Sequence, residues 1–237
     1  MYILTVRSYY TSVQYSLMGS GSNRESRRQQ LADACLRIAA ERGLEEVSIR
    51  EVAFEAGVAI ATVQYYFRSK DELLLFACEQ TMDAALSRID SVDTRGTVGQ
   101  VMRRALLELL PLDEERTTEL RVYFAFAARS VVSAELARVH AETLARFREN
   151  CAGAIRTAQQ LGQAPFELDP EREAAVLVAA VDGLSLHALT DPEALPTEEV
   201  EAALDAHLGR IFELGGVESA AEDQDSSEEE SDPGAVG

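Results

Sequence analysis

The sequence predicts an all-α protein with a three-helix head and a larger helical-bundle body, about nine helices in all. Apolar residues recur three and four positions apart along most of the chain, which is the spacing of one helix face. Glycine and proline interrupt this pattern where helices would end. No segment alternates apolar and polar residues as a half-buried strand does.

The first predicted helix runs from Ser22 to Arg42, and Gly43 ends it. Its expected buried stripe consists of Leu31, Ala34, Cys35, Ile38 and Ala39. Because a helix with one apolar stripe buries that stripe against other elements, we expect this helix to brace the short helices that follow it.

Residues 48–70 carry two short helical patterns separated at Gly57. Ser48 followed three residues later by Glu51 is a capping-box pattern, so the first helix begins there. Gly57 ends it, because glycine adopts the left-handed C-cap conformation without the steric cost of a Cβ atom, and Val58 can then return to the core. The spacing predicts a tight helix-turn-helix, the geometry that places a helix in the major groove of DNA.

The second short helix has two chemically different sides. The side assigned to packing consists of Val63, Tyr66 and Phe67. The side expected to face outward consists of Ile60, Ala61, Gln64 and Tyr65. Thr62 and Gln64 can hydrogen-bond to bases or phosphates, and Tyr65 can donate to phosphate. The alternative is a helical hairpin that only packs, in which Tyr65 is core and Arg50 an ordinary solvated side chain.

A second capping-box pattern, Ser69 with Glu72, predicts that a helix begins at Lys70, the only lysine in the chain, and runs to about Asp90. A cation in the first turn opposes the helix dipole, so a phosphate bound there would explain the position of Lys70. Five further helices are predicted near residues 97–110, 113–131, 133–161, 170–189 and 197–214.

From Ser22 to about Leu75 the sequence resembles the TetR family of one-component bacterial regulators. The resemblance rests on the Gly-Val turn, a small-residue helix containing Thr62, a Tyr-Tyr-Phe run and then Ser-Lys-Asp-Glu. The remainder is similar in being long and all-helical, with a weaker similarity around Glu119 to Glu142 to the branch of the choline-responsive repressor.

The resemblance implies that Arg50 and Thr62 contact bases, and that four residues lie on the DNA backbone or groove wall: Ser48, Gln64, Tyr65 and Lys70. With the outward side of the second helix, the candidate DNA-binding residues are Ser48, Arg50, Ile60, Ala61, Thr62, Gln64, Tyr65 and Lys70. The chain departs from the family at Ala59, where a capping serine is usual, at Ile60, where a polar residue is common, and at Gln64, where tyrosine is usual. These departures predict a different operator preference.

A body of this family holds a small molecule between its helices and supplies a dimer interface. The candidate ligand-binding residues lie on middle helices with wide apolar faces: Phe76, Met102, Leu106, Tyr123, Phe126, Phe147 and Cys151. Such stripes also describe ordinary core residues. His187, Asp182 and Ser185 either orient a ligand or satisfy one another across the dimer.

We expect a homodimer through the helices near 170–189 and 197–214. The first contributes a face with small residues, Ala175, Val178, Ala179 and Asp182-Gly183. The second contributes an apolar stripe, Leu204, Leu208, Ile211 and Phe212.

The net charge of −19 is distributed unevenly. Residues 20–70 hold eight basic and seven acidic residues, whereas residues 71–216 hold thirteen and twenty-six. We assign residues 22–70 to DNA binding and residues 71–216 to ligand binding and dimerisation, with a disordered arm over 1–21, where Met18 is an alternative start, and a disordered acidic tail over 217–237. Because the acidic residues lie away from the head, they repel DNA from the rest of the surface and favour one docking orientation.

Other classes of function find little support in the sequence. Three widely spaced cysteines and three histidines show no metal-ligand spacing, and no phosphate-binding glycine loop or nucleophile elbow occurs, so we expect no metal, cofactor or enzymatic activity. No run approaches the roughly 18 apolar residues of a membrane span, so we expect a cytoplasmic protein. The family resemblance implies a repressor that binds a palindromic operator as a homodimer and is released by a small, mostly apolar effector. The alternative is a ligand-binding helical scaffold without DNA binding.

Overall fold

The computed structural model describes residues 22–212. Within this range it contains nine α-helices, one short 3₁₀ helix and no strand, so the all-α prediction is confirmed there. The elements are α2 (Ser22–Arg42), η2 (Leu44–Glu46), α3 (Ile49–Glu55), α4 (Ile60–Tyr66), α5 (Lys70–Asp90), α6 (Val98–Leu107), α7 (Glu114–Ser130), α8 (Ala134–Gln160), α9 (Pro170–Thr190) and α10 (Thr197–Ile211). The predicted N-terminal arm and acidic tail lie outside the described residues.

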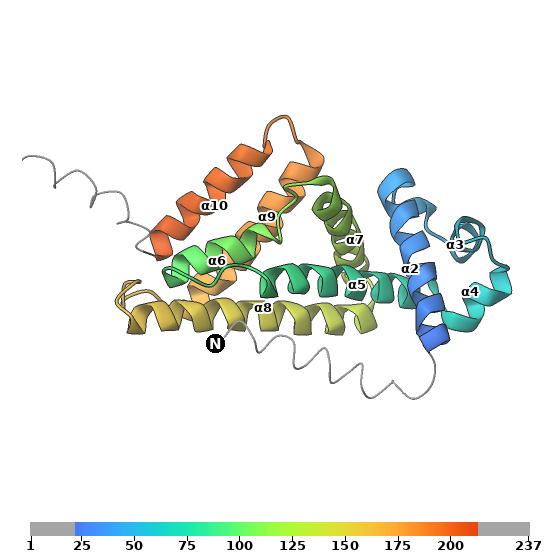
Figure 1. The fold of residues 1–237 in the computed structure, drawn as a ribbon, viewed down its shortest axis with the longest axis horizontal. Helices are drawn as coiled ribbons and strands as arrows, with labels where there is room; N and C mark the ends of the chain where they lie inside the picture. Colours follow the sequence, from blue (N-terminus) through green and yellow to red (C-terminus); the bar gives the residue numbers. More distant parts are fainter. Residues whose placement is uncertain (1–21, 213–237) are drawn as a thin grey trace, which may run out of the picture.

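Helices α2, α3 and α4 form the head, which lies at one end of the molecule (Figure 1). Its core combines the predicted stripe of α2 with one buried side of each short helix. The fully buried members include Leu31, Ile38, Val52, Val63 and Phe67. The helix α2 therefore braces the helix-turn-helix, as its apolar stripe predicts.

The turn between α3 and α4 is fixed by Gly57, whose φ is +65°. The N–H of Gly57 donates to the carbonyl of Phe54 at 3.1 Å, and the N–H of Val58 donates to that of Ala53 at 2.9 Å. These two bonds form a Schellman motif, with Val58 partly buried against the head core. A side chain at this φ would cost roughly 1–2 kcal/mol, so glycine sets the angle between the two helices.

The two serine caps are observed, but each forms only half of a capping box. The hydroxyls of Ser48 and Ser69 accept the N–H groups of Glu51 and Glu72, both at 3.1 Å. The carboxylate of Glu72 accepts the N–H of Arg68 at 2.7 Å, one residue before the expected partner. The helix starts at α3 and α5 are therefore as predicted, with a different reciprocal bond at α5.

Helix α4 begins without a side-chain cap, as its sequence predicts. Ala59 has the extended backbone of an N-cap, with φ −69° and ψ 146°, and makes no side-chain bond. Alanine in place of a capping residue costs a helix about 1 kcal/mol. The position of α4 therefore depends on the burial of Val63 and Phe67.

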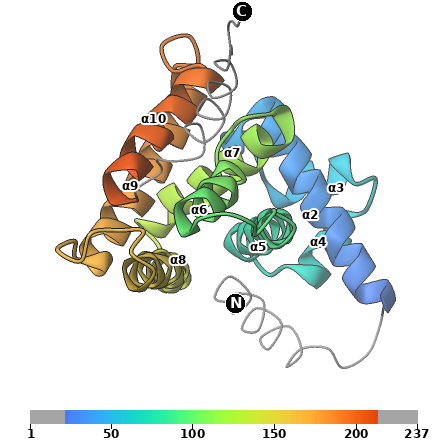
Figure 2. The same ribbon diagram turned by 60° about the vertical axis from the view of Figure 1, so that its left-hand side comes forward.

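Helices α5 to α10 form the body, in which α8 and α9 are long and pack against each other (Figures 1 and 2). The main body core lies between α6, α8, α9 and α10. Its fully buried members include Ile155, Leu177, Leu204 and Leu208. In Figure 2, α10 lies beside α9 on the side of the body away from the head.

Head and body share buried residues along α5 and α7. Four buried residues near the start of α5 and Val122 of α7 belong to the same hydrophobic cluster as the head core. Arg121 of α7 donates to the carbonyl of Ala40 in α2 at 3.3 Å, and Arg129 binds the carboxylate of Asp71 at 2.9 Å. Helix α7 is therefore in direct contact with α2 of the head and with the start of α5, the helix that follows the head.

Helix α9 is long enough and apolar enough to span a membrane by length and composition, with a mean hydropathy of 1.4 over eighteen residues, although polar residues interrupt its apolar run. Core helices of soluble proteins have the same length and composition. Leu177, Val178 and Val181 pack α9 into the body core. A membrane is therefore not needed to explain the composition of α9.

The predicted interface stripe of α10 is buried within the single chain, which corrects the expected interface. Leu204, Leu208, Ile211 and Phe212 are at most 2% exposed, and Val178 of α9 is 3% exposed. These side chains complete the body core and are not available to a second copy. Helical spacing shows that a stripe is buried, but it does not show which neighbour covers it.

Candidate functional site

Helix α4 buries one side and presents the other to solvent. The packed side consists of Val63, Phe67 and, in part, Tyr66. The open side consists of Ala61, Gln64, Ile60 (46% exposed) and Tyr65 (71% exposed). The predicted division of this helix is therefore confirmed, because every residue of the open side is exposed.

The remaining candidate DNA-binding residues lie at the starts of three consecutive helices. Arg50 is exposed in the first turn of α3, and Ser48 is the half-buried N-cap before it. Thr62 is half-buried in the first turn of α4, and Lys70 is the half-buried first residue of α5. The structure thus places these four residues at three successive helix starts, and the hydroxyl of Ser48 has a structural role as a cap.

Some arginines of the head form ion pairs with carboxylates, and others do not. Arg37 and Arg42 of α2 pair with carboxylates of α3 at 3.1 and 3.2 Å. Arg24, Arg50 and Arg68 form no ion pair with any described residue. The head has nearly equal numbers of basic and acidic residues, but its unpaired arginines leave positive charge around α4 that can bind phosphate.

The structure also places a residue from outside the helix-turn-helix motif beside the candidate DNA-binding residues. The guanidinium carbon of Arg24, in the first turn of α2, lies 5.9 Å from the ring centre of Tyr65. Arg24 lies far from the helix-turn-helix in sequence, so motif spacing gives no indication of this contact. The available signal is the pair Arg24 and Arg28, one helical turn apart, facing an aromatic run.

The seven candidate ligand-binding residues fall into three separate hydrophobic clusters. Phe76 belongs to the head cluster, where its ring lies 5.6 Å from that of Phe67. Tyr123 and Phe126 belong to a small cluster between α5, α7 and α8. The other four, in the main body core, are Met102, Leu106, Phe147 and Cys151. The structure does not gather the seven around one cavity, and ligand binding by any of them stays a prediction.

A hollow of about 850 Å³ opens between the head and the body. Its lining includes Gln29 and Leu36 of α2, Asp83 of α5 and Glu115 of α7. Burial raises the pKa of Asp83. None of the seven candidate ligand-binding residues lines this hollow, and its carboxylates do not suit a mostly apolar effector.

A polar contact joins α7 to α9 inside the body. The Tyr123 hydroxyl donates to the carboxylate of Asp182 at 3.3 Å, and the His140 ring lies 5.8 Å from the rings of Tyr123 and Phe126. Ser185 is 1% exposed, and its hydroxyl has no hydrogen-bond partner among the described residues. Asp182 is therefore satisfied within its own chain, by a candidate ligand-binding residue.

Replacing Asp182 with asparagine is expected to raise the stability of the protein at neutral pH. Burial raises the pKa of Asp182 above its ordinary 3.8, and the hydrogen bond from Tyr123 opposes this shift only in part. The folded state therefore favours the neutral carboxyl, and the stability it contributes is lost as pH rises through the folded pKa. Asparagine stays neutral and still accepts the bond from Tyr123.

Urea unfolding of wild type and Asp182→Asn from pH 4 to pH 8 measures this effect. We expect the variant to be more stable at the upper end, with the difference shrinking as pH falls toward 4. A variant that is less stable than wild type at pH 8 would show that the ionised carboxylate is favourable in the fold.

The cysteines have the surroundings of small apolar side chains. All three are buried, and burial raises the pKa of the Cys35, Cys78 and Cys151 thiols to about 12. Because the thiolate is the reactive form, these residues are inert at neutral pH. Within residues 22–212 no group of histidine, cysteine and carboxylate side chains is arranged to hold a metal ion.

An open recognition helix on a braced head, joined to a helical body, defines the class of helix-turn-helix transcriptional regulators. Comparison with known families agrees. Residues 31–76 match the bacterial regulatory proteins of the tetR family, and residues 99–213 match the C-terminal part of BetI-type transcriptional repressors. The chain belongs to the TetR family of transcriptional regulators.

Individual relatives support this assignment. The transcriptional regulator PksA of Bacillus subtilis is 31% identical over 188 residues, which cover 79% of this chain and 90% of PksA. The crystal structure of a transcriptional regulator from Rhodococcus sp. Rha1 is 40% identical with a TM-score of 0.70, covering 78% of this chain and 95% of that one. A regulator from Saccharomonospora viridis in complex with choline has a TM-score of 0.69 at 23% identity, covering 79% and 98%, which shows the shared fold.

Proposed function

We propose that this protein is a transcriptional repressor that binds a palindromic operator as a homodimer and leaves it when a small molecule binds the body. The observation that carries the proposal is the open side of α4, whose residues are exposed while the opposite side is fixed in the head core. A helix presented in this way fits the major groove, whose base edges carry the sequence information.

The proposed contacts follow from the chemistry of each side chain. Arg50 and Thr62 read base edges, while Gln64, Tyr65 and Lys70, with Ser48, bind the DNA backbone or groove wall. The exposed side chains at positions 60 and 61 are apolar and suit contact with thymine methyl groups. We therefore expect A·T pairs where the start of α4 meets the groove.

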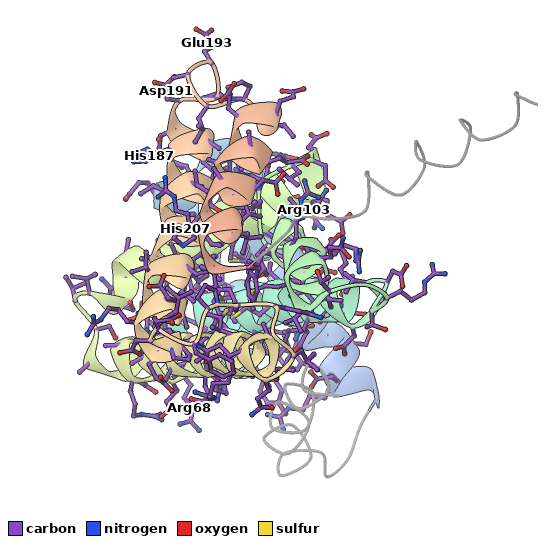
Figure 3. The ribbon with its side chains drawn as sticks, turned by 90° about the vertical axis from the view of Figure 1, so that its left-hand side faces the viewer. Arg68, Arg103, His187, Asp191, Glu193 and His207 are labelled. Carbon is purple, nitrogen blue, oxygen red and sulfur yellow. The ribbon has the colours of Figure 1, made fainter. Side chains whose placement is uncertain are left out.

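The homodimer is proposed to form through α9 and α10, by surfaces other than the buried stripe of α10. The open side of α9 includes Ala175, Val176, Ala179 and Leu186, and only 28% of its apolar window is buried in the single chain. The open side of α10 includes Ala202, Ala206 and Gly209. Small side chains allow close approach of helices from a second copy. Figure 3 shows α9 and α10 side by side, with His187 and His207 on them.

The effector is proposed to act through α7. On this helix Val122 is buried with the head core, while the neighbouring Tyr123 bonds to Asp182 of α9. An apolar molecule with one polar group that displaces Tyr123 from Asp182 would shift α7, and with it the head. The proposed repressor works in the cytoplasm, where its operator is.

Fluorescence anisotropy with labelled DNA from upstream of the protein's own gene tests the proposal. We expect saturable, sequence-selective binding that weakens steeply as salt rises, because phosphate contacts release counterions. Unrelated DNA of the same length is the control. Equal or absent binding to both DNAs over the whole salt range would favour the alternative, a ligand-binding scaffold without DNA recognition.

A further inference from the structure

We infer that Arg24 is an additional DNA-backbone contact, held beside the recognition helix by stacking on Tyr65. The inference rests on the proposed DNA binding. Arg24 lies before residues 31–76, the segment that matches the family's DNA-binding region. It extends the nucleic-acid surface from the helix-turn-helix onto the first turn of α2.

The ring of Tyr65 is held from two directions although its side chain is mostly exposed. The Tyr66 ring meets it edge-on, with centres 5.0 Å apart and planes at 90°. The guanidinium of Arg24 lies 5.9 Å from its centre, within the range of a cation–π contact. These contacts orient Tyr65 on the open side of α4 and place a positive charge next to it.

The guanidinium of Arg24 keeps its donors available. Arg24 is exposed and makes no hydrogen bond or ion pair with any described residue. Arginine has five N–H donors in a plane, so a face can stack on a ring while the edge binds an acceptor. A phosphate beside Tyr65 would supply that acceptor.

The other arginines in the first two turns of α2 are occupied differently. Arg28 lies over Phe67 and Phe76, at 5.2 and 4.3 Å from the ring centres, and is half-buried. Arg27 donates to the side chain of Gln30 at 2.6 Å. Of the three, Arg24 alone combines a contact with the recognition helix and an unused guanidinium edge. Arg27 is therefore a matched control, with the same charge on the same helix.

The salt dependence of operator binding tests the inference. Each phosphate contact contributes about 0.9 to the slope of log affinity against log salt, so Arg24→Ala in both subunits should lower the slope by about 2. Arg27→Ala should keep the wild-type slope. Arg24→Lys keeps the charge and should keep most of the slope, with some loss of affinity because lysine stacks poorly on a ring.

The preference among operator sequences should be the same in all these variants, because a backbone contact does not read bases. A wild-type slope in Arg24→Ala, equal slopes in Arg24→Ala and Arg27→Ala, or Arg24→Lys behaving like Arg24→Ala would each overturn the inference. Urea unfolding midpoints equal to wild type show that the head is intact. Failure of the proposed function is a separate result, since wild type itself would then show no selective binding.

Discussion

Replacing Arg50 with alanine is expected to lower the affinity for the operator by about 10- to 100-fold and to remove the base preference at one position of each half-site. Arg50 is exposed in the first turn of α3 and forms no ion pair with a described residue. Its guanidinium is therefore available for a base edge, and its removal should not disturb the head core. Anisotropy titrations against operators varied one position at a time measure both effects.

Lys70→Ala is the matched comparison, because it removes a cation from the start of α5 instead of α3. We expect it to weaken binding to all sequences alike and to lower the salt slope, since a phosphate contact is independent of sequence. If Arg50→Ala and Lys70→Ala have the same sequence profile, the division between base reading and backbone binding is wrong.

Ala179→Arg is expected to convert the dimer to monomers and to lower operator affinity by about 100-fold or more. Ala179 is exposed on α9 in the single chain, so arginine fits the isolated fold but blocks the close approach of a second α9. Two linked reading heads gain about 10²–10⁴ in affinity over one, and a monomer loses this gain. Sedimentation velocity and anisotropy on the same samples measure the two changes.

Ala145→Arg, at an exposed position of α8, is the control for the added charge and bulk. It should remain dimeric and bind the operator as wild type does. A wild-type protein that sediments as a monomer at micromolar concentration, or an Ala179→Arg variant that stays dimeric, would contradict the proposed interface.

Features decided by local backbone chemistry could be predicted from the sequence. Gly57 ends α3 because few other residues adopt its positive φ, and Ser48 and Ser69 mark helix starts because their hydroxyls cap the first N–H groups. The open side of α4 was predictable too, because Val63 and Phe67 are large apolar residues on the other side of the same helix.

Features decided by distant neighbours could not be predicted in this way. The stripe containing Leu204 and Leu208 meets its own chain and not a second copy, because α9 and α6 cover it. The aromatic residues Phe76 and Tyr123 lie in different clusters although both fit an apolar stripe. Arg24 reaches Tyr65 only through the fold of the head, and no sequence spacing encodes that distance.

Hydroxyl-radical footprinting of the upstream DNA tests the central claim most directly, because it shows where each head lies on the duplex. The account predicts two protected blocks related by two-fold symmetry, with centres one or more helical turns of about 34 Å apart. Protection should fade in Ala179→Arg and persist in Ala145→Arg. Uniform cleavage, or one unsymmetrical block that survives in Ala179→Arg, would contradict paired insertion of α4 into the groove.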